Sequence, residues 1–146
     1  MRLTLFIVIE THIFMKLILF FWLLLMAKCC FAQEISTIDF VQVLEDNEKE
    51  AIYYYKHNWE VLREMAQDKG YIQSYQFLKT EYTEEAPFHL MLVTTYANEK
   101  QYEIRELHFA EVIKEKGSLE LMNNKKPDEF RRTLFSKEAR NIKNKE

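Results

Sequence analysis

Four side chains in the middle of the sequence have the types and positions expected of a ligand-binding site. Asn58 lies near the centre of an apolar helical stripe, where a buried amide must find hydrogen-bond partners. In a functional interpretation, this amide orients a ligand or an oxygen molecule. In the alternative interpretation, it is bonded to a neighbouring backbone group. The other three candidates are Trp59, Tyr75 and His89.

For two of these three residues, Trp59 and His89, the sequence also allows a purely structural role. Trp59 lies at the edge of the same stripe and could wall a pocket for a flat ligand, but a lone tryptophan is also common in cores and interfaces. Tyr75 is expected on an aromatic face of a strand. His89 lies in an apolar strand, where it could act as a general base or an axial ligand. The alternative is a neutral histidine that is hydrogen-bonded near the end of the strand.

A second group of residues is typical of a contact surface. Ile104, Leu107 and His108 lie together on a predicted helix, away from its core stripe, and are candidate interface residues. No two histidines are four residues apart, and no motif combines histidine with carboxylates at metal-binding spacing. The sequence therefore predicts no metal site.

Several classes of chemistry lack the residues they need. The two glycines, Gly70 and Gly117, both stand at predicted helix ends, so the chain has no glycine-rich phosphate loop and no nucleophile elbow. Both cysteines precede residue 33, which excludes disulfides, zinc–thiolate sites and a cysteine nucleophile in the remainder. We therefore expect no cofactor.

The charge balance argues against nucleic-acid binding. Of 20 basic and 23 acidic residues, three basic and one acidic fall within residues 1–32, so residues 33–146 carry a net charge of about −5. A net negative charge repels the phosphate backbone, so no nucleic-acid partner is expected.

The first 32 residues have the three parts of an export signal. Lys16 provides the charged start, Leu17–Ala27 form a short apolar run, and Ala32 provides a small residue before the expected cleavage site. The apolar run is shorter than the ~20 residues that a transmembrane helix needs. The sequence therefore predicts an exported protein, periplasmic or secreted, with no stable membrane anchor after cleavage.

Two details of this segment bear on its interpretation. Residues 1–14 are interrupted by polar side chains, which indicates that Met15 is the true start. A lipoprotein signal is the competing interpretation, but Lys28 directly precedes Cys29, which does not fit that pattern.

The remaining residues contain five elements with clear signals. Strands are expected at 35–44, 71–82 and 88–96, where β-branched and aromatic residues gather. Helices are expected at 48–69 and 98–117, each free of glycine and proline until its final glycine. The two later strands are close in sequence and predict an antiparallel hairpin.

The C-terminal part has weaker signals. Residues 118–122 could form a short final strand, and Pro127 opens a short helix that we expect to reach Phe135. Residues 136–146 are polar and are expected to be mobile. The expected organisation is thus a signal peptide over 1–32, a domain over 33–122 and an extension over 123–146.

The order strand, helix, strand, strand, helix, strand predicts an α+β fold of the ferredoxin-like βαββαβ type, with helices on one face of an antiparallel sheet. The helix that carries Trp59 and ends at Gly70, the hairpin Tyr71–Tyr96 and the helix Asn98–Gly117 resemble the dimeric α+β barrel group. In that group two such sheets pack face to face. The resemblance implies a homodimer, which would also explain strands that are apolar on both faces.

The resemblance leaves the function open, because the group includes cofactor-free oxygenases, haem-degrading enzymes and stress-response domains. We expect a non-catalytic module that binds a small apolar or aromatic ligand, or a partner protein of the cell envelope. The first alternative is a cofactor-free oxygenase or haem-acting enzyme that uses Asn58, Trp59 and His89. The second is a structural or assembly subunit that uses the surface of Ile104, Leu107 and His108.

Overall fold

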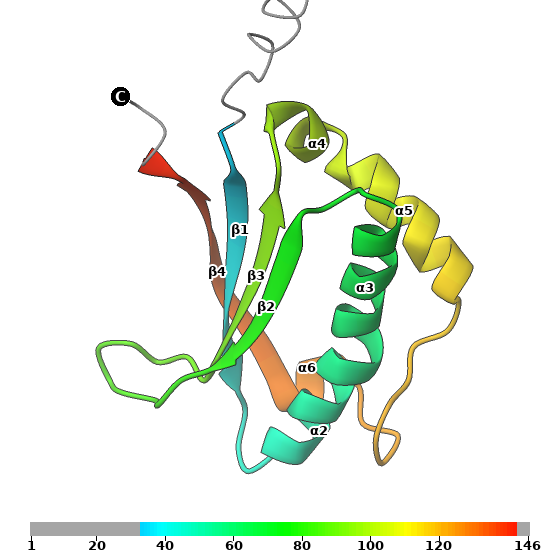
Figure 1. Cartoon of the computed structure of the whole chain (residues 1–146). Helices are drawn as coiled ribbons and strands as arrows, with labels where there is room; N and C mark the ends of the chain where they lie inside the picture. Colours follow the sequence, from blue (N-terminus) through cyan, green and yellow to red (C-terminus); the bar gives the residue numbers. More distant parts are fainter. Residues whose placement is uncertain (1–32, 143–146) are drawn as a thin grey trace, which may run out of the picture. The chain divides into compact units, whose positions relative to one another are not determined.

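Four strands form one antiparallel sheet, and the helices lie against one of its faces (Figure 1). The computed structural model describes residues 33–142. The elements are β1 (Ile35–Val43), α2 (Glu48–Tyr54), a π-helical segment (Tyr55–Glu60), α3 (Val61–Asp68), β2 (Ser74–Lys79), β3 (Leu90–Tyr96), α4 (Glu99–Glu103), α5 (Arg105–Lys116), α6 (Pro127–Phe130) and β4 (Arg131–Arg140).

The sheet has the strand order β2-β3-β1-β4, and every neighbouring pair is antiparallel. β2 and β3 form the expected hairpin, while β1 lies in the centre between β3 and β4. The α+β class with one antiparallel sheet is therefore confirmed, and the arrangement is consistent with the ferredoxin-like type.

The first helical region runs from Glu48 to Asp68 without a break, as its composition predicts. Its middle turn, Tyr55–Glu60, is π-helical, which the sequence pattern did not indicate. Gly70 follows with φ of 71°, a backbone angle that glycine adopts without steric cost. The helix ends there as expected.

The second helical region begins with the predicted cap. The Asn98 side chain accepts a hydrogen bond from the Gln101 backbone N–H (2.9 Å), and the Gln101 side chain accepts one from the Ala97 N–H (2.7 Å). The region is divided near Ile104 into α4 and α5. Gly117 ends α5 with φ of 81°.

The two faces of the sheet differ in how they are covered. Alternate residues of β1 and β3, including Val41, Leu90 and Leu92, are buried under the helices together with Ala51 and Tyr55. The residues between them point to the opposite face, which no described helix covers (Figure 1). That open face carries Ile38, Phe40, Met91, Val93, Leu78 and Phe135.

The C-terminal expectations were wrong. Residues 118–122 form no strand but part of the connection between α5 and α6, and the short helix ends at Phe130 instead of Phe135. The fourth strand is Arg131–Arg140, within the supposed extension and mobile tail. β4 is an edge strand and mostly exposed, so it has few apolar residues to mark it in the sequence.

Within residues 33–142, no helix has both the length and the apolar character needed to cross a bilayer. The same stretch contains no group of three or more histidine, cysteine, aspartate or glutamate side chains placed to hold a metal ion. The predicted export signal lies outside the described residues.

Candidate functional site

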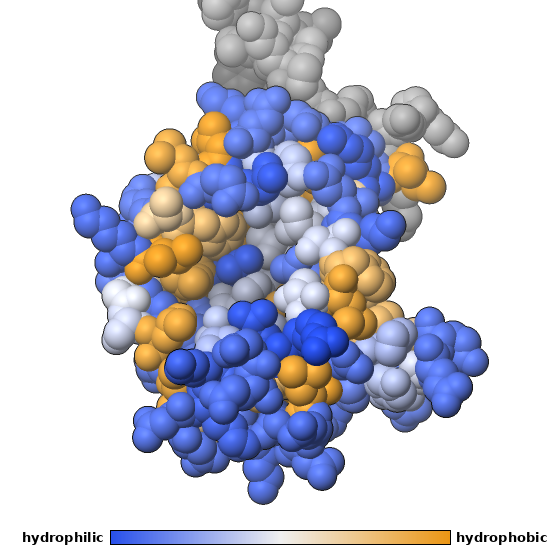
Figure 2. Space-filling model, turned by 180° about the vertical axis from the view of Figure 1, so that it is seen from behind, coloured by the Kyte–Doolittle hydropathy of each residue, from blue (hydrophilic) through white to orange (hydrophobic). Residues whose placement is uncertain are grey.

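A cleft lies between the helices and the part of the sheet formed by β1 and β4. It consists of two adjoining cavities, of about 270 Å³ and about 500 Å³, which share Asp39 from β1 and Arg63 from α3. Figure 2 views the molecule from behind and shows a hollow with hydrophilic side chains inside it. The cleft exists because α5 packs beside α3 and leaves β4 uncovered (Figure 1).

Three aromatic residues and two arginines are among the eleven residues that line the smaller cavity, which we call the aromatic cavity. Its walls come from the first helical region, from β1, β3 and β4, and from the segment after α5. Its lining residues are Asp39, Tyr54, Tyr55, Asn58, Trp59, Leu62, Arg63, Leu92, Leu119, Arg131 and Thr133.

Three buried polar atoms of the aromatic cavity have no hydrogen-bond partner within the described residues. They are the Tyr55 hydroxyl, Trp59 Nε1 and Arg131 Nε. Tyr55 is 3% exposed and Trp59 is 8% exposed, so neither residue has much contact with bulk water. A buried polar group without a partner costs about 1–3 kcal/mol. Only one other such atom, His108 Nδ1, occurs in residues 33–142, and His108 does not line this cavity.

Arg63 separates the two cavities. Its guanidinium lies 4.6 Å from the ring centroid of Trp59 and 4.3 Å from that of Phe109, so aromatic rings hold it on both sides. Its Nε donates a 3.2 Å hydrogen bond to the buried hydroxyl of Thr94. Burial lowers the pKa of Arg63 to about 10, which still leaves it charged at neutral pH.

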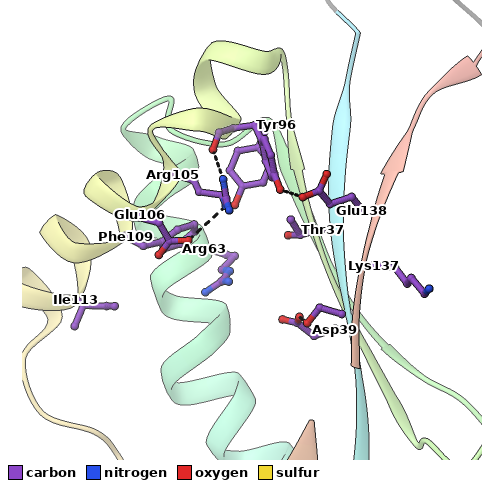
Figure 3. Close-up of a pocket in the computed structure, with 12 residues that line it drawn as sticks. Thr37, Asp39, Arg63, Tyr96, Arg105, Glu106, Phe109, Ile113, Lys137 and Glu138 are labelled. Carbon is purple, nitrogen blue, oxygen red and sulfur yellow. Dashed lines mark hydrogen bonds and ion pairs between the residues drawn. The ribbon is translucent and has the colours of Figure 1, made fainter. Parts of the chain in front are cut away.

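The larger cavity is lined by six charged residues, twice as many as the smaller one, and we call it the polar cavity (Figure 3). Arg105 donates to the Tyr102 backbone carbonyl (2.9 Å) and lies 3.4 Å from a Glu106 carboxylate oxygen, so its charge is partnered. The Tyr102 hydroxyl donates to Glu138 of β4, and this hydrogen bond is the main reason that the pKa of Tyr102 is raised. These contacts give the Tyr102 hydroxyl and the Arg105 guanidinium partners within the polar cavity.

Asn58 lies in the wall of the aromatic cavity, but its amide is fully engaged by the protein. Nδ2 donates to the Tyr54 carbonyl (2.9 Å) and the Glu120 carbonyl (2.8 Å). Oδ1 accepts from the Glu120 N–H (2.8 Å) and from Lys116 Nζ (3.0 Å). These four bonds use the capacity of the amide, so the geometry gives Asn58 the task of tying residues 116–120 to the helix.

Trp59 lines the aromatic cavity next to Asn58, whereas His89 and Tyr75 line neither cavity. His89 precedes β3, its Nδ1 accepts a 3.0 Å hydrogen bond from the Val43 N–H, and its ring stacks on Tyr82. Tyr75 packs its ring edge-on against Trp59, and its hydroxyl donates to Glu64 (3.3 Å). The structure therefore does not bring His89 together with Asn58 and Trp59, as an enzyme using all three would require.

The second predicted surface is only partly exposed. Leu107 is 72% exposed and Ile104 is 38% exposed, both on the outer helical layer. His108 is half-buried, and its ring stacks on Tyr71 with the centroids 3.7 Å apart. Ile104 and Leu107 could contact a partner, whereas His108 mainly packs within the chain.

The sequence analysis missed Arg63, Arg131 and Asp39 as residues of the cleft. Charged residues are normally solvated, and Arg131 and Asp39 line the same cavity only because β4 pairs with β1. One signal for Arg63 was present: it follows Trp59 by four residues, so the two side chains are neighbours on a helix.

No protein-family model matches the chain, and no curated protein matches it in sequence. Solved structures that are similar to the chain include the following two. HapK from Hahella chejuensis has a TM-score of 0.46 and 9% sequence identity, with 75% of this chain and 93% of HapK covered. The chlorite dismutase-like protein TA0507 has a TM-score of 0.41 and 5% identity, with 75% of this chain and 44% of TA0507 covered.

Proposed function

We propose that this chain is a binding module for a small, flat ligand with an apolar or aromatic body, held in the aromatic cavity. The observation that carries the proposal is that Tyr55 and Trp59, which line the same cavity, each bury a polar atom that has no partner among the described residues. Natural proteins rarely leave such atoms unpaired. A ligand oxygen within reach of both would supply the missing partner, while the rings contact its apolar body.

The two groups act as hydrogen-bond donors toward this ligand. The indole N–H can only donate. Burial raises the pKa of the Tyr55 hydroxyl well above its usual value, so this group stays protonated at neutral pH and can donate as well. The cavity volume of about 270 Å³ suits a ligand of one or two rings.

The indole N–H of Trp59 offers a direct test. The probe is 2-naphthamide, a neutral planar compound with an acceptor oxygen, added to ¹⁵N-labelled protein recovered from cells that express the full chain. With Trp22 replaced by phenylalanine, one indole signal remains in the NMR spectrum. We expect a saturable downfield shift of that signal, because a new acceptor deshields the indole proton.

Matched tyrosine variants locate the binding. Tyr55→Phe is expected to weaken naphthamide binding several-fold, because it removes one donor of about 1 kcal/mol. Tyr53→Phe on the same helix is the control, since Tyr53 does not line the cavity. An indole signal that does not move up to the solubility limit of the probe would show that this proposal is wrong.

We also propose that two copies of the chain associate through the open face of the sheet. This face has a contiguous apolar surface in which Leu78 is 41% exposed and Phe135 is 44% exposed, and Phe40 stacks on Phe135 at 4.6 Å. Its flanks are complementary in charge: the β2–β3 loop carries Glu81, Glu84 and Glu85, whereas Arg132 and Lys137 lie on β4. A two-fold arrangement allows the acidic loop of one copy to meet the basic strand of the other.

Native mass spectrometry of the variants Val93→Glu and Leu107→Glu distinguishes a dimer interface on the open face from one on the surface of Ile104 and Leu107. A charge at Val93, in the middle of the open face, is expected to dissociate the dimer, because it would be buried without a partner. A charge at the exposed Leu107 is expected to leave the dimer intact. Dissociation by Leu107→Glu alone would instead favour the assembly surface on α5, and a monomeric wild type would exclude both.

A further inference from the structure

The aromatic cavity holds two arginines that have no carboxylate partner within 4.0 Å among the described residues. Arg131 Nε is buried and unpartnered. The terminal nitrogens of Arg131 reach only the Thr133 and Tyr54 hydroxyls, both at a long 3.5 Å. Among residues 33–142, Arg63 has one hydrogen bond, from Nε to Thr94, and its terminal nitrogens have no hydrogen-bond partner.

Two partly buried guanidinium groups without counter-ions are unfavourable. Rings stack on the faces of both groups, as Arg131 lies 5.1 Å from the centroid of Tyr54 and Arg63 packs against Trp59 and Phe109. Stacking satisfies the planar faces but leaves the N–H groups at the edges free. An anionic oxygen group is the partner that matches these edges in charge and in geometry.

The charge inside the cavity indicates how many negative charges the ligand carries. Asp39 is the only carboxylate among the lining residues, and it accepts a hydrogen bond from the Ser136 hydroxyl. With Arg63 and Arg131 the lining carries one excess positive charge at neutral pH. A single negative charge restores neutrality, which favours a carboxylate over a doubly charged phosphate.

We infer that the ligand of the aromatic cavity is a planar compound with one carboxylate, which Arg131 and Arg63 receive while the aromatic side chains contact its ring. The inference rests on the proposed function and adds the chemical class of the ligand. Trp59 and Tyr55 line the same cavity, and their buried donor atoms would serve a second oxygen of that ligand.

The test compares 2-naphthoate with the neutral 2-naphthamide by calorimetric titration of the protein recovered from cells that express the full chain. We expect 2-naphthoate to bind about tenfold more tightly or better, because a hydrogen bond between a guanidinium and a carboxylate is charge-assisted and stronger than one to a neutral amide. Arg131→Gln is expected to reduce this preference to about twofold or less while naphthamide binding changes little. Thermal unfolding of each variant verifies that it folds.

Arg132→Gln is the matched control, because Arg132 neighbours Arg131 on β4 but pairs with Gln42 on the opposite face. It is expected to retain the full preference for naphthoate. Equal affinity for naphthoate and naphthamide would overturn the carboxylate assignment and leave the binding module standing. Tighter binding of 2-naphthyl phosphate than of naphthoate would also overturn it, whereas no binding of any probe would refute the proposed function itself.

Discussion

At the scale of single residues, Asn58 is the clearest case of a polar group with a structural task. Its amide is 1% exposed and makes four hydrogen bonds, two of them to the backbone of Glu120. We expect Asn58→Ala to lower the free energy of unfolding by about 2 kcal/mol or more, because it leaves buried backbone groups without partners. Urea unfolding measures the loss, and the exposed Lys56→Ala is the control.

A loss below about 0.5 kcal/mol would contradict this assignment, because surface substitutions typically fall in that range. Asn58→Asp provides a finer test. It preserves the shape and the acceptor Oδ1 but replaces the donor nitrogen with an oxygen that faces two carbonyls. It is therefore expected to destabilise the fold despite its near-identical volume.

The sequence identified Asn58 because an amide in an apolar stripe is conspicuous, but it could not tell which partner the amide has. That partner, Glu120, is 62 residues away, in a segment with no periodic signal. Arg131 was missed for a similar reason, since its position in the cavity depends on a strand pairing. Trp59 was found from local spacing alone, because it lies at the edge of the same helical stripe as Asn58.

At the scale of elements, the connection between α5 and α6 is attached to α2 through Glu50. The Glu50 carboxylate accepts a 3.0 Å hydrogen bond from Asn123 and lies 3.3 Å from Lys125 Nζ. The hydrogen bond from Asn123, aided by Lys125, lowers the pKa of Glu50. A carboxyl group whose pKa is lower in the folded state stabilises the fold above its unfolded pKa, about 4.3.

This contribution is present at neutral pH and is lost as the pH falls through the lowered folded pKa of Glu50. We therefore expect Glu50→Gln to be less stable than the wild type at pH 7, and the difference to shrink at pH 3. Urea midpoints at both pH values measure this change. Glu48→Gln on the same helix is the control, and a difference for Glu50→Gln that stays constant with pH would contradict the role of its charge.

The edge strand β4 was the element that sequence reasoning placed wrongly. Its exposed residues give no alternation of apolar side chains, and the pairing with β1 shifts register between Phe40 and Val41. Thr133 pairs with Val41 and Phe135 with Phe40, which leaves Leu134 as an extra residue in the ladder. Strand prediction relies on side chains that alternate between the two faces, and this alternation is interrupted in the middle of β4.

Because Leu134 is the extra residue in the ladder, we expect its deletion to affect stability less than deletion of Ser136. Removing Leu134 permits regular pairing with every other side chain on its present face, so we expect a loss of about 1 kcal/mol or less. Removing Ser136 moves Lys137–Arg140 to the opposite face and deletes the hydrogen bond to Asp39, so the loss is expected to be larger. Urea unfolding compares the two, and a reversed order would show that the extra residue is needed.

At the scale of the whole molecule, the sequence predicted the α+β class with one antiparallel sheet, although only two glycines and two prolines mark where elements could end. The prediction that the helices cover one face of the sheet agrees with the structure. Strands that are apolar on both faces also predicted that a second copy covers the other face, and this remains a prediction. The cleft could not be foreseen in the same way. It depends on α5 packing beside α3 instead of covering β4, which no local pattern specifies.

Cleavage after Ala32 would leave every described element of the fold intact. The Gln33 side chain donates a hydrogen bond to the Asn141 carbonyl, and β1 begins at Ile35. The fold therefore begins just after the expected cleavage site, which lies outside every described helix and strand. We propose that the chain is exported and that Ala32 is the last residue removed. Peptide mapping of protein recovered from its producer is expected to give Gln33 as the N-terminus. An Ala32→Arg variant removes the small residue that signal cleavage requires and is expected to accumulate uncleaved. Recovery of the wild type with residues 15–32 attached would contradict export by cleavage.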